Sequence, residues 1–185
     1  MSTTTIIILA VIVIVVAALG WWAYRQQRTK QLRSKFGPEY THAVHQYGSE
    51  SRAEDALAER ARRMEKFHAR ALTSEDHDRF LQRWSAVQAS FVDDPPSSIE
   101  QADGLVNEVM RARGYPMGDF DRRAEDISVE HPKVVQNYRA AHEIAERQAR
   151  GQAATEDLRQ ALVHYRALFE ELLEGHLTHE GSKRR

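Results

Sequence analysis

Glutamate and histidine residues at helical spacing are the side chains of this sequence that could bind a metal ion. The chain holds nine histidines and no cysteine, so such a site would use imidazole and carboxylate ligands. The pairs Glu39–His42 and Glu65–His68 each match Glu-x-x-His, which places both groups on one helical face, and His45 lies one turn from His42. About one such match is expected by chance in this composition. A full two-metal site would also need an inward-facing glutamate from each of two more helices. We therefore expect no metal ion and no cofactor.

Residues that could carry out catalysis are equally sparse. The absence of cysteine excludes a thiol nucleophile, and the sequence contains no Gly-x-Ser-x-Gly, P-loop or Gly-x-Gly-x-x-Gly motif. His142 and His164 each adjoin an apolar stripe, where either could be a general base. A hydrogen-bonded histidine at the edge of a core is the commoner arrangement. We expect no catalytic residue and no enzyme; a membrane-tethered metal protein or enzyme is the alternative.

An apolar run near the N-terminus predicts a helix that spans a membrane. Residues 6–24, IIILAVIVIVVAALGWWAY, contain no charged side chain. As a helix rising about 1.5 Å per residue, they would cover roughly 28 Å, close to the ~30 Å hydrocarbon core of a bilayer. A cleaved signal peptide would need a basic segment before a shorter apolar run. The flank at residues 1–5, MSTTT, has no basic residue.

Side chains at the end of this run predict its orientation. Basic residues next to a span stay on the cytoplasmic side, and aromatic residues gather at the membrane–water interface. We therefore expect a single-pass protein of the plasma (inner) membrane, with its N-terminus outside and its C-terminal domain in the cytoplasm. An extracytoplasmic domain is the alternative. The basic residues could be a topology signal alone or could also attract anionic lipids, at about 1 kcal/mol per charge. The expected interface residues are Trp21, Trp22 and Tyr24, followed in a linker at 25–37 by Arg25, Arg28, Lys30, Arg33 and Lys35.

The remaining residues predict an irregular multi-helix bundle, giving an all-α chain with one N-terminal transmembrane helix. We expect one helical domain at 38–175 and a disordered tail at 176–185. Apolar residues recur at helical spacing in the segments 80–91 and 158–172. Residues 36–185 carry a net negative charge. The whole chain has 26 Lys and Arg against 27 Asp and Glu, and all the acidic residues lie after residue 35. A domain with a net negative charge is a poor candidate for binding the phosphate backbone of a nucleic acid.

Local signals predict where these helices begin and end. The Gly37-Pro38 break predicts a helix over 38–47 that ends near Gly48. Capping boxes at Ser51–Glu54 and Ser97–Glu100 predict two further starts, the first for a long helix to about residue 72. Three other helix starts are predicted, at Thr73 or Ser74, at His131-Pro132 and at Thr155. The basic pairs Arg62-Arg63 and Arg122-Arg123 are interpreted as solvated helix faces.

The turn-rich segment RGYPMGDF at 113–120 carries three large apolar side chains, Tyr115, Met117 and Phe120. Exposed side chains of this kind could form the surface for a partner protein. The alternative is that they fold back over the end of the bundle. Both interpretations remain open from the sequence alone.

Four stretches, KFGPEY at 35–40, RWSAVQASFVDDP at 83–95, RGYP at 113–116 and TEDLRQALVHYRALFEELL at 155–173, together carry a resemblance. They resemble a family of uncharacterised bacterial proteins, labelled membrane or secreted, with an N-terminal hydrophobic segment and a helical domain. The resemblance implies a bacterial source and an inner or plasma membrane setting, and it carries no activity, ligand or catalytic residue over to this chain. We expect a membrane-anchored interaction or scaffold module, with an unknown protein partner or a second copy as its ligand.

Overall fold

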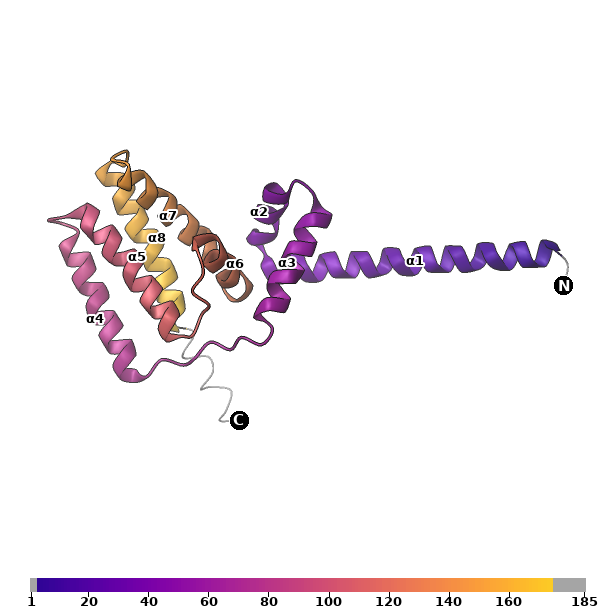
Figure 1. Ribbon diagram of the computed structural model, residues 1–185, viewed down its shortest axis with the longest axis horizontal. Helices are drawn as coiled ribbons and strands as arrows, with labels where there is room; N and C mark the ends of the chain where they lie inside the picture. The colour runs from indigo at the N-terminus through magenta and orange to yellow at the C-terminus, as the bar shows by residue number, and fades with distance from the viewer. Residues whose placement is uncertain (1–2, 175–185) are drawn as a thin grey trace. The chain divides into compact units, whose positions relative to one another are not determined.

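The computed structural model describes residues 3–174, with side chains from Ile12 onward, and its regular secondary structure over these residues is entirely helical (Figure 1). No strand occurs among residues 3–174, so the predicted all-α class is confirmed. The tail expected at 176–185 lies outside the described residues, as do the side chains of the flank at 1–5. The helices are α1 (Thr3–Phe36), α2 (Pro38–Tyr47), α3 (Glu50–Met64), α4 (Ser74–Ser90), α5 (Pro95–Ala112), α6 (Phe120–Glu130), α7 (Val135–Ala149) and α8 (Thr155–Glu174).

The chain divides into two compact units. Unit 1 comprises Met1–Ala58 and unit 2 comprises Glu59–Arg185. The boundary falls inside α3, within the range 38–175 that the sequence analysis treats as one domain. Each unit is described by itself below.

Unit 1 is built around α1, a single helix of 34 residues. The helix ends because Gly37 takes a φ of +48°, a left-handed conformation that favours glycine, and Pro38 then starts α2. Gly48, at φ +72°, ends α2 and donates its backbone N–H to the carbonyl of Val44. The prediction of a helix over 38–47 is confirmed.

The N-terminal part of α1 contains the span expected at residues 6–24. No helix is both long enough and apolar enough to cross a membrane within the part of the chain whose side chains the structure describes. That part begins at Ile12, so the first residues of the expected span lie outside it.

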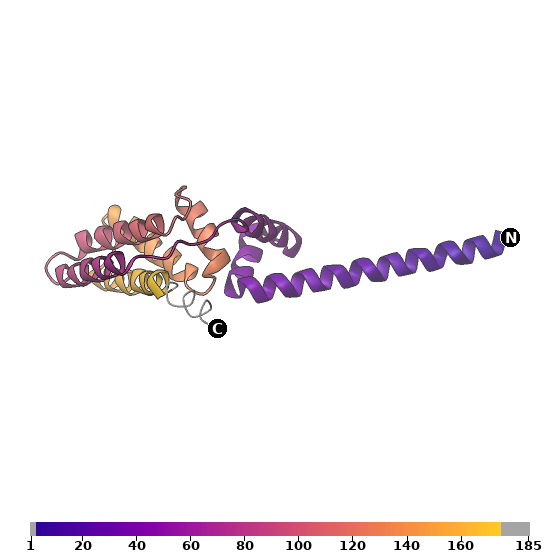
Figure 2. The same ribbon diagram turned by 90° about the horizontal axis from the view of Figure 1, so that it is seen from below.

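Unit 2 has its core between α4, α5, α7 and α8, which run alongside one another (Figures 1 and 2). The ring of Trp84 on α4 stacks on that of Phe169 on α8, with centroids 4.7 Å apart. The apolar stripes predicted on these two helices are buried, with Phe91 at the edge. The buried residues of the α8 stripe are Leu158, Ala161, Tyr165, Leu168, Phe169 and Leu172.

The end of α3 differs from the prediction. The helix stops at Met64 and not near residue 72, and an irregular segment follows to Thr73. The long helix is predicted because Phe67 continues the helical spacing of the apolar residues Leu57 and Met64. In the structure the Phe67 ring packs on that of Tyr115, with centroids 4.6 Å apart. The apolar side chain of Phe67 is therefore explained by a tertiary contact and does not indicate a longer helix.

Two predicted capping boxes are also wrong. Helix α3 begins at Glu50, two residues earlier than a cap at Ser51 implies, and the backbone N–H of Arg52 donates to Ser49 Oγ at 3.4 Å. Helix α5 begins at Pro95, where the Asp94 carboxylate accepts the backbone N–H of Ser97 at 3.2 Å. In both cases the cap is a polar residue that precedes the predicted one in the chain, Ser49 in place of Ser51 and Asp94 in place of Ser97.

The other predicted starts are closer to the structure. Thr73 caps α4, as predicted, and its hydroxyl accepts the backbone N–H of Asp76 at 3.0 Å. Helix α7 begins at Val135, because the segment 131–134 forms a turn ahead of it. Thr155 is the first residue of α8 and not its cap.

Candidate functional site

The end of α1 and the start of α3 meet in a continuous set of polar contacts within unit 1. Arg28 Nη2 lies 2.8 Å from Asp55 Oδ1, and Arg33 Nη2 lies 2.8 Å from Glu50 Oε1. We call this set the α1–α3 seam. Its residues are Arg25, Arg28, Thr29 and Arg33 of α1 with Glu50, Ser51, Glu54 and Asp55 of α3.

Glu54 lies at the centre of the seam and is only 6% exposed. Its Oε1 atom accepts the hydroxyl of Thr29 at 2.7 Å and the hydroxyl of Tyr40 at 3.0 Å. Burial raises the pKa of Tyr40 above its usual value, the Arg33 guanidinium opposes this rise, and the hydrogen bond to Glu54 adds to it. Glu54 thus joins all three helices of unit 1 through one carboxylate.

The predicted interface residues have different environments. Trp21, Trp22 and Tyr24 are 67%, 63% and 64% exposed. Lys30 and Lys35 are exposed, and Lys35 Nζ lies 5.9 Å above the ring of Phe36. The seam could not be predicted from local patterns, because its partners are 17 to 27 residues apart along the chain.

The cations of the linker are therefore of two kinds. Arg28 and Arg33 are paired with carboxylates, although both pairs are too exposed to contribute much stability. Arg25 contacts α3 through a neutral group, because its Nη2 donates to Ser51 Oγ at 3.3 Å. The positive charge of Arg25 is thus left without a carboxylate in the described part of the chain.

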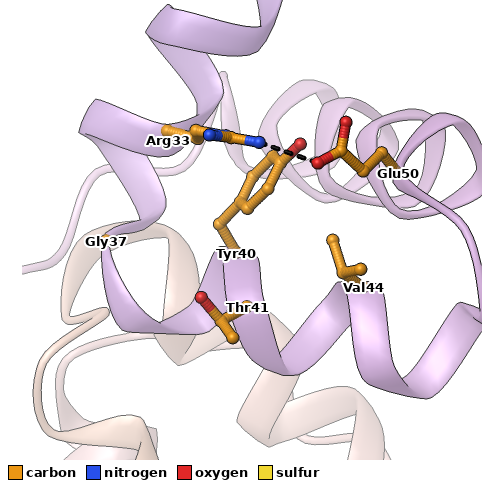
Figure 3. Close-up of a pocket in the computed structure, with 6 residues that line it drawn as sticks. All are labelled: Arg33, Gly37, Tyr40, Thr41, Val44 and Glu50. Carbon is orange, nitrogen blue, oxygen red and sulfur yellow. Dashed lines mark hydrogen bonds and ion pairs between the residues drawn. The ribbon is translucent and has the colours of Figure 1, made fainter.

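A pocket of about 340 Å³ opens beside the seam (Figure 3). The Arg33 guanidinium lies 4.9 Å above the Tyr40 ring and pairs with Glu50 across the pocket. Because these two charges satisfy each other, the pocket presents no unpaired charge to a ligand. The residues that line it are Arg33, Gly37, Tyr40, Thr41, Val44 and Glu50.

The predicted metal-binding pairs do not converge. His42 Nδ1 lies 3.9 Å from Glu39 Oε1, while Glu65 and His68 lie beyond the end of α3, where no helix aligns them. His45 is exposed. Within the residues that the structure describes, no three histidine, aspartate or glutamate side chains are grouped as a metal site would require.

The segment expected to offer a partner surface folds back on unit 2 at two of its three apolar residues. Tyr115 is 3% exposed, so for this residue the fold-back holds and a partner surface does not. Phe120 stacks on His142, with ring centroids 3.6 Å apart, and contacts Tyr138 at 4.8 Å. Met117, 37% exposed, is the apolar residue of the three that a partner could reach.

Polar residues that the sequence analysis did not single out hold this segment in place. The hydroxyl of Tyr115 donates to Glu130 Oε2 at 2.5 Å and lies 3.1 Å from His131 Nε2. The other ring nitrogen of His131 lies 2.9 Å from Glu171 on α8. Burial, together with the hydrogen bond to Glu130, raises the pKa of Tyr115 far above its usual value. This hydroxyl is therefore a hydrogen-bond donor and not a nucleophile.

The two histidines considered as general bases also make structural contacts. His164 Nδ1 lies 3.1 Å from Asn137 Oδ1, and His142 Nε2 lies 3.6 Å from Glu146. Neither lies beside the pocket of Figure 3, whose lining comes from unit 1 alone.

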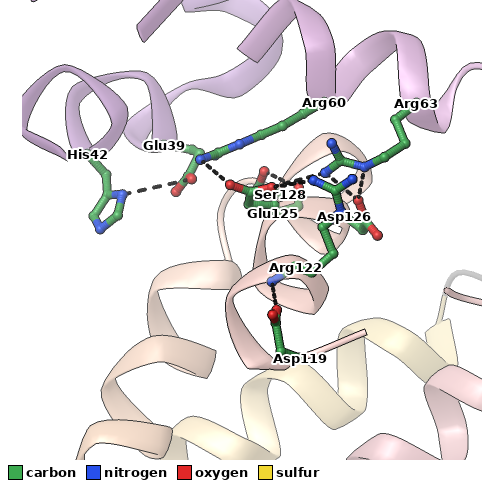
Figure 4. A network of polar contacts seen from close by, with 9 residues as sticks. All are labelled: Glu39, His42, Arg60, Arg63, Asp119, Arg122, Glu125, Asp126 and Ser128. Atoms are coloured by element: carbon green, nitrogen blue, oxygen red, sulfur yellow. Dashed lines mark hydrogen bonds and ion pairs between the residues drawn. The ribbon is translucent and has the colours of Figure 1, made fainter. Parts of the chain in front are cut away.

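An ion cluster in unit 2 binds the last turn of α3 to α6 (Figure 4). Arg63 Nε and Nη2 donate to Asp126 Oδ1 at 2.9 and 2.7 Å, and Arg60 Nη2 lies 3.2 Å from Glu125. Arg62 is a solvated face residue, as predicted, but Arg63 is only 20% exposed. The cluster is structural, because its charges are paired with one another.

Comparisons with known proteins found no relative of this chain. No protein-family model, no curated protein and no solved structure matches the chain.

Proposed function

We propose that the chain is a single-pass protein of the plasma (inner) membrane, whose helical domain acts as an interaction or scaffold module in the cytoplasm. The observation that carries this proposal is the continuity of α1. The helix runs without interruption from Thr3 to Phe36, so the apolar run and the polar seam belong to one rigid element.

The composition of α1 supports the anchor. Its residues 6–24 carry no charge, and a helix of that length matches the thickness of the hydrocarbon core. Its described apolar side chains are exposed, including Ile14 at 67% and Val16 at 62%. Apolar surface of this extent is costly in water and favourable in lipid.

The seam supports a particular use of the anchor. Because α2 and α3 are held against the end of α1, the first folded unit cannot swing freely about a flexible linker. An anchor of this kind confines the chain to a surface and raises its effective concentration for partners on the same membrane. The partner is another membrane-associated protein or a second copy of the chain.

Two experiments test the proposal. Carbonate extraction of membranes should leave the full chain in the pellet, and its release into the supernatant would contradict an integral anchor. Proximity labelling from a tag after Arg185 should repeatedly label a small set of membrane proteins or the chain itself. Uniform labelling of cytoplasmic proteins would contradict the role as an interaction module.

A further inference from the structure

The polar contacts around His131 need one hydrogen more than the neutral side chains supply. The hydroxyl oxygen of Tyr115 lies 2.5 Å from Glu130 Oε2 and 3.1 Å from His131 Nε2. His131 Nδ1 lies 2.9 Å from Glu171 Oε1. Each of these contacts needs a hydrogen between its two atoms. A phenol and a neutral imidazole carry one such hydrogen each, and a carboxylate carries none, so two hydrogens would have to serve three contacts.

Either neutral tautomer of His131 leaves one contact without its hydrogen. With the hydrogen on Nε2, the bare Nδ1 faces the Glu171 carboxylate. With the hydrogen on Nδ1, the one hydrogen of Tyr115 has two acceptors, Glu130 and His131 Nε2. At neutral pH the missing proton is added at less cost to an imidazole than to a carboxylate, because their ordinary pKa values are about 6.5 and 4.3. The three contacts are therefore all satisfied when His131 carries a hydrogen on both ring nitrogens.

The charges around His131 favour the same state. Glu130 of α6 and Glu171 of α8 supply two negative charges. Arg113 supplies a positive charge from the segment before α6, where it opposes the rise in the pKa of the neighbouring phenol. Lys133, in the turn that follows, is exposed, whereas only 10% of the His131 side chain is. An imidazolium brings the sum of the charges of the buried cation, the two carboxylates and the ring to zero.

We propose that His131 is held as an imidazolium and acts as a proton-dependent clamp, which fastens the segment 113–120 and the end of α6 to the last turn of α8. The clamp belongs to unit 2 and does not depend on the membrane anchor. In the opened state the histidine is solvated and releases its proton above its ordinary pKa of about 6.5. The closed state keeps that proton, so the clamp is fully stabilised below this pH and loosens as the pH rises, by up to about tenfold in the opening constant for each pH unit. The clamped segment carries Met117, the apolar residue that a partner could reach.

Nitrogen-15 NMR of the histidine rings tests the proton, in the full chain in detergent micelles at about pH 7.5. Ring nitrogens with and without a hydrogen differ widely in chemical shift, so the spectrum gives the protonation state and the tautomer. We expect both ring nitrogens of His131 to carry a hydrogen in the wild-type chain. His164, whose Nδ1 contacts the amide of Asn137, is the internal reference and should give the same signals in every variant.

Two variants should remove the extra proton and leave opposite tautomers. Tyr115→Phe deletes the hydroxyl, so a neutral His131 gives its one hydrogen to Glu171 from Nδ1. Glu171→Gln supplies an amide that donates to Nδ1, so a neutral His131 keeps its hydrogen on Nε2 for the oxygen of Tyr115. A ring that only fills space would show no such opposition. A single hydrogen on His131 in the wild-type chain, or the same tautomer in both variants, would overturn the proposal.

Amide hydrogen exchange tests whether the proton holds the segment. The wild-type chain and Glu171→Gln are compared at each pH between about 7 and 9, so that the intrinsic pH dependence of exchange cancels in their ratio. Peptides from 113–120 should be better protected in the wild-type chain near pH 7, and this advantage should shrink by up to about tenfold for each pH unit. Peptides of α4 are the control, and their ratio should stay constant. A ratio for 113–120 that does not change with pH would overturn the clamp, even if His131 carries both hydrogens.

Discussion

Replacing Glu54 tests how the three helices of unit 1 are held together. The substitution Glu54→Ala removes the acceptor of two hydroxyl hydrogen bonds, from Thr29 at 2.7 Å and from Tyr40 at 3.0 Å. Hydrogen bonds to a charged group contribute about 1.5–3 kcal/mol each. Thr29 is only half-buried and can turn to water, so we expect a loss of about 3 kcal/mol.

The substitution Glu54→Gln is the matched control. Its amide oxygen can accept both hydroxyl groups, so the contacts remain as neutral hydrogen bonds of about half the strength. We therefore expect the glutamine variant to lose less than about 1.5 kcal/mol.

Amide hydrogen exchange of the full chain in detergent micelles measures the effect locally, which suits a chain with two compact units. A loss of about 3 kcal/mol corresponds to roughly hundredfold faster exchange in the peptides of α3 from 50–58. Peptides of α8, in unit 2, should exchange as in the wild-type chain. Equal exchange of 50–58 in the wild-type, alanine and glutamine chains would refute the central role of this carboxylate.

Three further predictions concern unit 2. Arg63→Met should cost about 3–5 kcal/mol, because it leaves the Asp126 carboxylate buried without its cation, and adding Asp126→Leu should restore most of the stability in denaturant unfolding. Trp84→Ala should cost about 3–5 kcal/mol, since it empties a buried site that stacks on α8, and unchanged unfolding would contradict that packing. The Arg83 guanidinium lowers the pKa of Glu108, so this pair stabilises the fold above the ordinary pKa of a glutamate and is lost as the pH falls through the lowered value. In Arg83→Gln, a carboxyl NMR titration should find the Glu108 pKa raised toward its ordinary value.

Helix boundaries were predictable where the signal was local. Gly37, Pro38 and Gly48 fixed both ends of α2, because a left-handed glycine and a proline act on the backbone whatever their surroundings. The end of α3 was not predictable from periodicity, since Phe67 owes its burial to a ring 48 residues further along the chain, that of Tyr115.

The site was predictable in part. The sequence shows a group of cations after the apolar run, and it left their role open between topology signal and lipid contact. The sequence could not show that Arg28 and Arg33 pair with carboxylates, because those partners belong to another helix. Nor could it show that Ser51, which matched a capping box, contacts Arg25. Pairings of this kind depend on how the helices pack, and no spacing within one helix encodes them.

The orientation of the chain in the membrane tests the central claim most directly. The chain has no cysteine, so a single cysteine introduced as Ser2→Cys or Ser182→Cys is the only thiol that a membrane-impermeant maleimide can label. In intact cells whose outer barrier has been permeabilised, the account predicts labelling of Ser2→Cys and no labelling of Ser182→Cys until the membrane is lysed. Labelling of Ser182→Cys in intact cells would contradict the cytoplasmic domain, and labelling of neither variant in intact cells would contradict the span.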